Sequence, residues 1–251
     1  YSLFPDEALL APAREKLAEI LAHPVHRAPP THYIDLVFMA AGTWGRLGNL
    51  SGDPRHHDYL RALWRTNRDK FRDPASGLFV RDATWLAQPD GFRLLERNGQ
   101  PVFWGRGNGW ALGGLAQILL ALPPDDPARA EFARDFQRLA AAVVAVQPHD
   151  GLWRASLGDP ASYPLGETSG TALLAYGLLH GIRAGILDST TFRAPAERAL
   201  RALLAVQETN GKLGYVQPGA ESPRIPFCRA SNVEYATGAL LLAGAEWLRL
   251  P

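Results

Sequence analysis

Two aspartates lie in surroundings that suit acid–base chemistry. Asp82 falls in the aromatic-flanked stretch of residues 77–85, and Asp35 falls in the apolar run of residues 33–39. The aromatic neighbours of Asp82 exclude water from its carboxyl group and raise its pKa toward the value that a general acid needs near neutrality. An unpaired carboxylate in the apolar run around Asp35 would cost free energy, so Asp35 needs a partner or a cavity. Each has a simpler explanation: Asp82 pairs with Arg81 or closes a turn, and Asp35 caps a helix or makes an internal hydrogen bond to a helix end. Two carboxyl groups from neighbouring loops are what acid and base roles in sugar cleavage require.

The most unusual stretch is FWGRGNGW at residues 103–110. No strand pattern precedes its glycines and their spacing is not GxGxxG, which excludes a dinucleotide-binding loop. At the entrance of a helix, these glycines would let the backbone approach a ligand closely. Trp104 and Trp110 are suited to stacking on a pyranose ring, and Arg106 offers a planar fork to a carboxylate. The alternative is that both tryptophans are core residues and that Arg106 makes a surface salt bridge.

Hydroxyl side chains open a further helical segment at residues 166–172. Ser169 is the candidate in this segment for contact with a sugar, and helix capping is the favoured alternative. The seven histidines show no HExxH or other metal-ligand spacing, and His56 and His57 are expected on a solvated outer helix. The sequence therefore predicts no metal and no other cofactor.

Three related segments, each joining a glycine to an aromatic residue, divide the chain into repeats. We interpret each glycine as the stop of a helix. A charged amphipathic stretch precedes each segment, and a helical pattern rich in small residues follows it. The glycine–aromatic segments are residues 76–79, 150–153 and 210–215; the small-residue helices are 105–122, 168–186 and 233–248; the charged helices include 127–146 and 195–207.

The repeating unit is thus an outer amphipathic helix, a loop and an inner helix poor in charge. A further unit fits residues 5–23 followed by residues 33–47, which makes four helical hairpins and almost no strand. We predict a single all-α toroid over residues 1–251 that lacks its N-terminal hairpins. Its long loops would converge on one end of a central cavity. A compact eight-helix bundle, complete as it stands, is the alternative.

The overall charge excludes several classes of partner. Twenty-six basic and 25 acidic residues leave a net charge of +1, without the basic excess that attracts nucleic acid or an anionic membrane surface. No apolar run reaches the length of a transmembrane helix. The single Cys228 excludes an intramolecular disulfide and suits a reducing compartment. The sequence predicts an acidic oligosaccharide as partner and leaves the oligomeric state open.

Taken together, these stretches resemble the unsaturated glucuronyl and rhamnogalacturonyl hydrolases of glycoside hydrolase families 88 and 105, with the rhamnogalacturonyl branch, family 105, the closer. The matching segments occur in the same order along the chain as in the family, and together they cover nearly the whole chain. Members of these families have an (α/α)6 barrel, so the resemblance implies that fold here, with the first hairpins absent. The matching segments are residues 33–40, 77–82, 103–110, 150–153 and 167–176.

The resemblance also implies a mechanism. Such enzymes hydrate the C4=C5 double bond that a polysaccharide lyase leaves on a uronic acid, and the hemiketal product then opens and expels the remaining sugar. Asp82 matches the proton donor to C4, and Asp35 matches a second carboxylate that contacts the sugar and tunes Asp82. Trp104, Arg106 and Trp110 match residues of the sugar pocket. Because small unsaturated fragments are typically processed after import, the resemblance also implies a cytoplasmic location, which the single cysteine does not contradict.

Two other functions stay open. A sugar epimerase with this type of fold would need two opposed histidines on inner loops, and His149 and His180 are poorly placed for that role. An inactive carbohydrate-binding or scaffold domain is the other alternative, because the ring is expected to be incomplete. Turnover of an unsaturated disaccharide separates both alternatives from the hydrolase.

Overall fold

The computed structural model describes residues 6–22, 32–219 and 222–250. Within these ranges the chain forms eight α-helices, a short 3₁₀ helix and no strand beyond isolated bridges, which confirms the all-α prediction. None of the described helices has the length and apolar character needed to cross a membrane. The elements are α1 (Glu7–Ala22), α2 (Leu36–Ser51), α3 (Pro54–Phe71), η2 (Ala83–Trp85), α4 (Gly105–Ala121), α5 (Arg129–Ala145), α6 (Thr168–Arg183), α7 (Ser189–Val206) and α8 (Glu234–Trp247).

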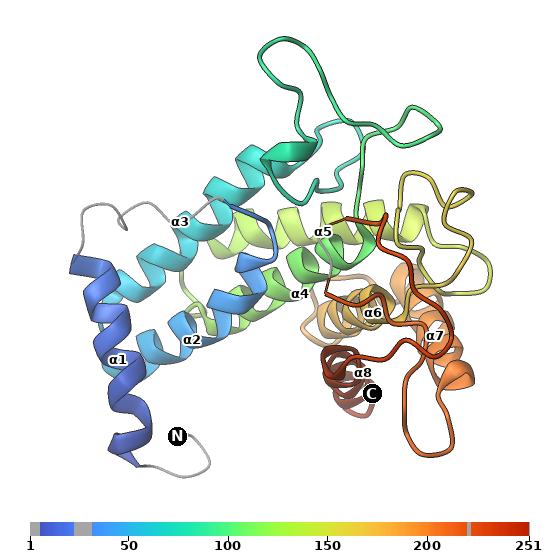
Figure 1. The fold of residues 1–251 in the computed structure, drawn as a ribbon. Coiled ribbons are helices and arrows are strands. Elements are labelled where there is room, and N and C mark those ends of the chain that lie inside the picture. The colour runs from blue at the N-terminus through green and yellow to red at the C-terminus, as the bar shows by residue number, and fades with distance from the viewer. Residues whose placement is uncertain (1–5, 23–31, 220–221, 251) are drawn as a thin grey trace.

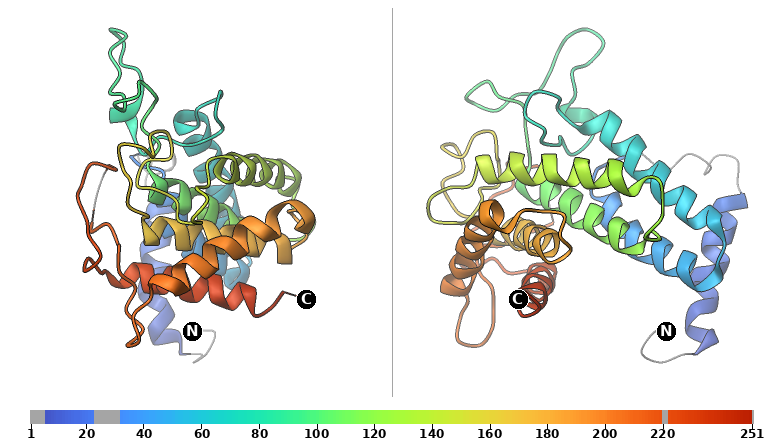
Figure 2. Two further views of the ribbon diagram at one scale, coloured as in Figure 1. Left: turned by 90° about the vertical axis from the view of Figure 1, so that its right-hand side faces the viewer. Right: turned by 180° about the vertical axis from the view of Figure 1, so that it is seen from behind.

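Four helices form an inner row and three others cover its outer side (Figure 1). Helices α2, α4, α6 and α8 pack against one another in this order, and α3, α5 and α7 each pack on the inner helix that precedes them. The row bends into an open arc, with α2 at one free side and α8 at the other, as the further views also show (Figure 2). Helix α1 packs on α2 at the first of these sides. Outer and inner helices thus alternate as predicted, in an arc and not in a compact bundle.

Glycines let the inner helices approach one another closely. A methyl group on Gly109 would lie 2.8 Å from Cβ of Leu173 in α6, and one on Gly114 would lie 2.6 Å from the backbone nitrogen of Phe38 in α2. Both distances are well inside van der Waals contact, so a larger residue would push α4 away from its neighbours. On Gly105, a methyl group would lie 2.5 Å from the carbonyl oxygen of Arg154. The expectation that the glycines of this stretch serve the approach to a ligand is therefore corrected for Gly105 and Gly109: they serve packing.

The glycines of the three repeated segments lie in turns beyond the helix ends. Gly77, Gly151 and Gly211 have φ values of 77°, 86° and 87°, a conformation that glycine adopts without steric cost. The preceding helices end more than one helical turn earlier. After α3 the chain doubles back on itself, as the bridge between Arg72 and Phe79 shows. The predicted helix stops are therefore wrong in position, because these glycines shape the loops that enter the inner helices.

The start of α7 differs most from its prediction. This helix begins at Ser189, well before Pro195, because Asp188 caps it by accepting hydrogen bonds from the backbone N–H groups of Thr190 at 3.3 Å and Thr191 at 3.0 Å. Pro195 lies inside the helix and leaves one backbone hydrogen bond unmade. Of the helix predicted over residues 5–23, the two end residues lie outside the described residues.

The outer helix α3 buries one of the two histidines expected in solvent. His56 is 6% exposed, and its ring centroid lies 5.6 Å from that of Trp44 in α2. Tyr59 stacks on the same tryptophan with a centroid distance of 3.9 Å. The expectation of a solvated His56 is therefore wrong, because this position falls on the face of α3 that packs against α2. His57 is half-buried.

Candidate active site

Two loop segments that are far apart in the sequence meet where α2 begins. Residues 33–35 lead into α2, and residues 79–82 follow the turn after α3. The backbone N–H of Ile34 donates to the carbonyl of Arg81 at 2.8 Å, and Tyr33 forms an antiparallel bridge with Asp82. This pairing brings Asp35 and Asp82 together at the loop end of the inner helices.

Arg81 lies between the two carboxylates. Its Nη1 donates to Oδ2 of Asp82 at 2.6 Å, and its Nε lies 3.7 Å from Oδ2 of Asp35. The guanidinium also lies over the ring of Tyr33, 4.8 Å from the centroid. The three charged side chains are nearly buried, and little water screens the charges of such groups from one another. The positive charge of Arg81 therefore lowers the pKa of Asp35.

Asp35 has the properties of a general acid. It precedes the first residue of α2, yet its side chain makes no capping hydrogen bond, so the capping explanation fails. It is 8% exposed, and its buried Oδ1 has no hydrogen-bond partner among the described residues. Burial raises its pKa to about 6, against the opposing effects of Arg81 and then Arg106. This carboxyl group keeps its proton to a pH at which an ordinary aspartate has lost it.

Asp82 makes both of the simpler contacts that the sequence allowed. Its Oδ1 accepts a hydrogen bond from the backbone N–H of Thr84 at 2.8 Å and so caps the short helix η2, while its Oδ2 is paired with Arg81. These contacts fix the carboxylate in place beside Asp35. They also occupy one lone pair on each of its oxygens.

Asn108 holds the Asp82 loop against α4. Its Oδ1 accepts from the backbone N–H of Phe79 at 2.9 Å, and its Nδ2 donates to the carbonyls of Phe79 and Trp104, each at 3.0 Å. The side chain is fully buried. Sequence reasoning missed this residue, although an amide in the charge-poor inner helix was a signal, because a buried amide must find partners.

Trp104 and Arg106 are buried and bind a loop of the protein itself. Nε1 of Trp104 donates to Oε1 of Gln217 at 2.8 Å. Nη1 of Arg106 donates to the carbonyl of Gln217 at 2.5 Å and Nη2 donates to that of Pro218 at 2.9 Å, with the guanidinium over the Trp104 ring. Trp110 is 8% exposed and packs on Phe38. Both tryptophans are thus buried in the core, as the alternative to sugar stacking proposed. Arg106 binds backbone carbonyls, whereas the sequence predicted either a ligand carboxylate or a surface salt bridge as its partner.

Ser169 lies inside the cap of α6. The carboxylate of Glu167 accepts hydrogen bonds from the backbone N–H groups of Ser169 at 3.1 Å and Gly170 at 2.6 Å, and from the Ser169 hydroxyl at 2.6 Å. The Ser169 hydroxyl also accepts from Arg106 at 3.2 Å, and the residue is fully buried. The backbone N–H of Gln217 donates to Glu167 as well, at 3.0 Å. The structure therefore shows the capping role, in a network that sequence reasoning did not reach.

The histidines do not form an opposed pair. His149 is exposed in a loop. His180 lies near the other end of α6, where it is 2% exposed and its Nδ1 lies 3.4 Å from Oε1 of Glu246. Nor do the described residues contain any group of three or more His, Cys, Asp or Glu side chains with the geometry to hold a metal ion.

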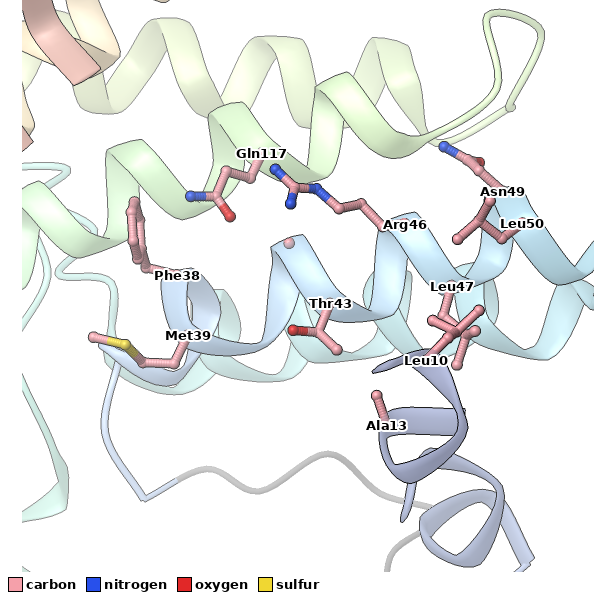
Figure 3. Close-up of a pocket in the computed structure, with 11 residues that line it drawn as sticks. Leu10, Ala13, Phe38, Met39, Thr43, Arg46, Leu47, Asn49, Leu50 and Gln117 are labelled. Atoms are coloured by element: carbon pink, nitrogen blue, oxygen red, sulfur yellow. The ribbon is translucent and has the colours of Figure 1, made fainter. Parts of the chain in front are cut away.

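A cavity of about 740 Å³ runs along the free side of α2 (Figure 3). Met39, Thr43 and Arg46 line it from α2, Gln117 lines it from α4 and Leu10 lines it from α1. Among the described residues, no carboxylate lines this cavity. Because it offers no acid, we place the candidate active site at the loop end of the arc, around Asp35, Arg81 and Asp82.

Residues 8–251 match Glycosyl Hydrolase Family 88. The chain belongs to this family. It is 34% identical over 218 residues to an unsaturated 3S-rhamnoglycuronyl hydrolase of Formosa agariphila. The matched region covers 87% of this chain and 58% of that relative. The chain thus spans little more than half the length of this curated relative.

Solved structures agree on the fold. A family 88 glycosyl hydrolase from Bacteroides vulgatus has a TM-score of 0.90 at 31% identity, over 99% of this chain and 71% of that one. A family 105 glycoside hydrolase from C. acetobutylicum has a TM-score of 0.72 at 23% identity, over 87% of this chain and 65% of that one. The predicted six-hairpin glycosidase fold is confirmed, and the described residues supply four of its inner helices.

Proposed function

We propose that the protein removes an unsaturated uronyl residue from the non-reducing end of lyase-generated oligosaccharides by hydrating its C4=C5 double bond. One observation carries this proposal: Asp35 is a buried carboxyl group with a pKa of about 6, beside an arginine and a second carboxylate. An enol ether reacts once a proton is delivered to carbon, and an acid that keeps its proton up to about pH 6 supplies that proton. Membership of family 88 and the name of the Formosa relative support the same class of reaction.

We assign the proton transfer to Asp35, which reverses the roles that the family resemblance implied for the two aspartates. Both oxygens of Asp82 hold a contact within the protein, whereas Oδ1 of Asp35 has no hydrogen-bond partner among the described residues. Delivery of a proton requires an acid that is protonated and an oxygen that is not held by another group of the protein. Asp82 then orients the substrate and the incoming water, and Arg81 supplies the positive charge for the uronate carboxylate.

The proposed steps balance in protons and electrons. Asp35 gives its proton to C4, the double-bond electrons form the new C–H bond, and positive charge develops at C5, where the ring oxygen stabilises it. Water adds to C5 and returns a proton to Asp35. The hemiketal opens by breaking the bond from C5 to the ring oxygen, which leaves a ketone at C5. Collapse of the hemiacetal at C1 expels the leaving sugar.

Isotope labelling of the product tests this proposal. We expect an unsaturated disaccharide to lose its enoate absorbance, to gain deuterium at C4 in D₂O and to gain ¹⁸O at C5 in H₂¹⁸O. Direct attack on the glycosidic bond would instead release an unsaturated uronic acid that loses its absorbance only as the freed ring opens and tautomerises, so release of the leaving sugar would precede loss of absorbance. Binding of the disaccharide without turnover would favour a scaffold, and inversion of a saturated sugar without loss of absorbance would favour an epimerase.

A further inference from the structure

The cavity of about 740 Å³ along α2, which we call the α2 cavity, is lined by polar side chains that the protein itself does not use. Arg46 makes no hydrogen bond, ion pair or ring contact with any described residue. The side chains of Thr43 and Gln117 likewise have no hydrogen-bond partner in the described part of the chain. Asn49 uses one of its two polar atoms, with Oδ1 lying 3.1 Å from Nε2 of His57. The cavity therefore offers donors and acceptors to a ligand.

Helix geometry gathers these side chains on one face of α2. Met39, Gly42, Arg46 and Asn49 are separated by three or four residues, which aligns them along the helix. The side chain of Arg46 points across the cavity toward Gln117 of α4 (Figure 3). Gly42 keeps this space open, because a methyl group there would lie 3.0 Å from Oε1 of Gln117. The guanidinium and the amide thus face the same space from two inner helices.

This polar face lies apart from the proposed acid. Arg46 follows Asp35 by about three helical turns, or roughly 16 Å along the axis of α2. Phe38 lies between them along the helix, where its ring packs on Trp110 at a centroid distance of 4.7 Å. The α2 cavity is therefore a second site and not an extension of the candidate active site.

The lining of the α2 cavity determines which ligands it suits. Among the described residues that line it, only Arg46 is charged, and a guanidinium pairs best with a planar oxyanion such as a carboxylate. Two amides and one hydroxyl group provide donors and acceptors for ligand hydroxyl groups. Leu10 and Leu47 add apolar surface for C–H groups, and the volume lies within the range of small-molecule sites. A sugar acid combines a carboxylate, hydroxyl groups and C–H faces.

We propose that the α2 cavity is a second, non-catalytic site that binds a sugar acid. Arg46 binds the carboxylate, and Thr43, Gln117 and Asn49 bind the hydroxyl groups. This inference does not depend on the proposed reaction, because no residue that lines the cavity has a role in that reaction.

The only methionine of the sequence, Met39, provides the test. Its side chain is 55% exposed and lines the cavity, so methyl-¹³C methionine labelling gives one NMR resonance at the site. We expect glucuronate to shift this resonance saturably, with a Kd that weakens in added salt. Glucose, which lacks the charge, and butyrate, which lacks the hydroxyl groups, should each bind at least about tenfold more weakly.

Substitutions in the cavity identify the groups that hold the ligand. Arg46→Ala should raise the Kd of glucuronate about tenfold, and Thr43→Val should raise it about threefold. Arg201→Ala, at an exposed position of α7, is the matched control and should leave the Kd unchanged. An unchanged Kd in Arg46→Ala, or equal binding of glucuronate and butyrate, would overturn the proposal.

Two further results separate this site from the candidate active site. A shift of the Met39 resonance that Arg81→Met abolishes and Arg46→Ala leaves intact would place the ligand at the active site, and it would also overturn the proposal. If the unsaturated disaccharide is not turned over while glucuronate binds as expected, the proposed reaction fails and the α2 cavity stands as a binding site.

Discussion

Two arginines at the loop end of the inner helices are used in opposite ways. Arg106 is 3% exposed, and its terminal nitrogens donate to the carbonyls of Gln217 and Pro218 and to the hydroxyl of Ser169. Arg81 faces two carboxylates, and its Nε has no hydrogen-bond partner among the described residues. The hydrogen bonds from Arg106 to backbone carbonyls hold a loop in place. Arg81 instead lies beside two carboxylates, and its Nε–H is not used in a hydrogen bond within the described residues. The Arg106 region should therefore govern stability, and the Arg81 region should govern activity.

The largest effect should follow removal of the acid in the Arg81 region. Asp35→Asn should lower kcat/KM roughly 10³-fold, since a positioned general acid contributes about 10²- to 10⁴-fold. Asp82→Asn should cost less, because an amide retains an oxygen for Thr84 and only orientation is impaired. Initial rates of enoate loss measure both, with Asp90→Asn in an exposed loop as the control. A larger loss in Asp82→Asn than in Asp35→Asn would reverse our assignment.

Removal of the buried cation should destabilise the fold. Arg106→Met should lower the free energy of unfolding by about 2–4 kcal/mol, because the carbonyl of Pro218 loses its donor and that of Gln217 keeps only the Tyr235 hydroxyl, at about 1–3 kcal/mol for each hydrogen bond lost. Arg81→Met should lower it by less, because the Asp82 carboxylate keeps its hydrogen bond from Thr84 and Asp35 can take up a proton, while it should reduce activity more than about tenfold. Urea unfolding measures the first quantity, with the exposed Arg201→Met as control. Equal destabilisation by Arg81→Met and Arg106→Met would remove the distinction between the two regions.

The buried carboxyl group of Asp35 should cost stability at high pH. Its pKa rises from 3.8 in the unfolded chain to about 6 in the folded protein, so the folded state binds the proton more tightly. The wild type therefore loses stability as pH rises from about 4 through 6, and Asp35→Asn does not. At pH 8 the variant should be more stable than the wild type by about 2–3 kcal/mol. Urea unfolding at pH 4 and pH 8 should show this gain only at the higher pH; a gain that is equal at both would contradict the raised pKa.

The smallest effect concerns the arginine between the carboxylates. The positive charge of Arg81 lowers the pKa of Asp35, so Arg81→Gln should raise it and move the alkaline fall of kcat/KM from about pH 6 to a value roughly one unit higher. Arg81→Lys should leave this fall near its original position. A variant that lowers the rate at every pH without moving the profile would show that Arg81 only supports the loop.

The helices could be predicted from the sequence because their signals are local. The alternation of charged and small-residue stretches indicated the outer and inner helices. The apolar run around Asp35 indicated a carboxyl group whose burial costs free energy unless it has a partner or a cavity. The roles of Trp104 and Arg106 could not be predicted. They depend on Gln217, more than a hundred residues further along the chain, and no local pattern shows that its loop returns to cover them.

The choice between the two aspartates also required the fold. Both have apolar or aromatic neighbours in the sequence, but only the packed structure shows that Asp82 caps a turn and pairs with Arg81 while Asp35 keeps a buried oxygen without a partner. Asn108 and Glu167 were missed for a related reason. Their side chains hold backbone groups of other segments, so their importance appears once those segments are placed side by side.

The central claim is that Asp35 is the acid that keeps its proton toward neutrality. A carboxyl ¹³C NMR titration of the aspartate-labelled protein tests it without reference to turnover. We predict one resonance that titrates near pH 6, is absent from Asp35→Asn and persists in Asp82→Asn. Loss of that resonance in Asp82→Asn but not in Asp35→Asn, or titration of every aspartate below about pH 4.5, would contradict the account.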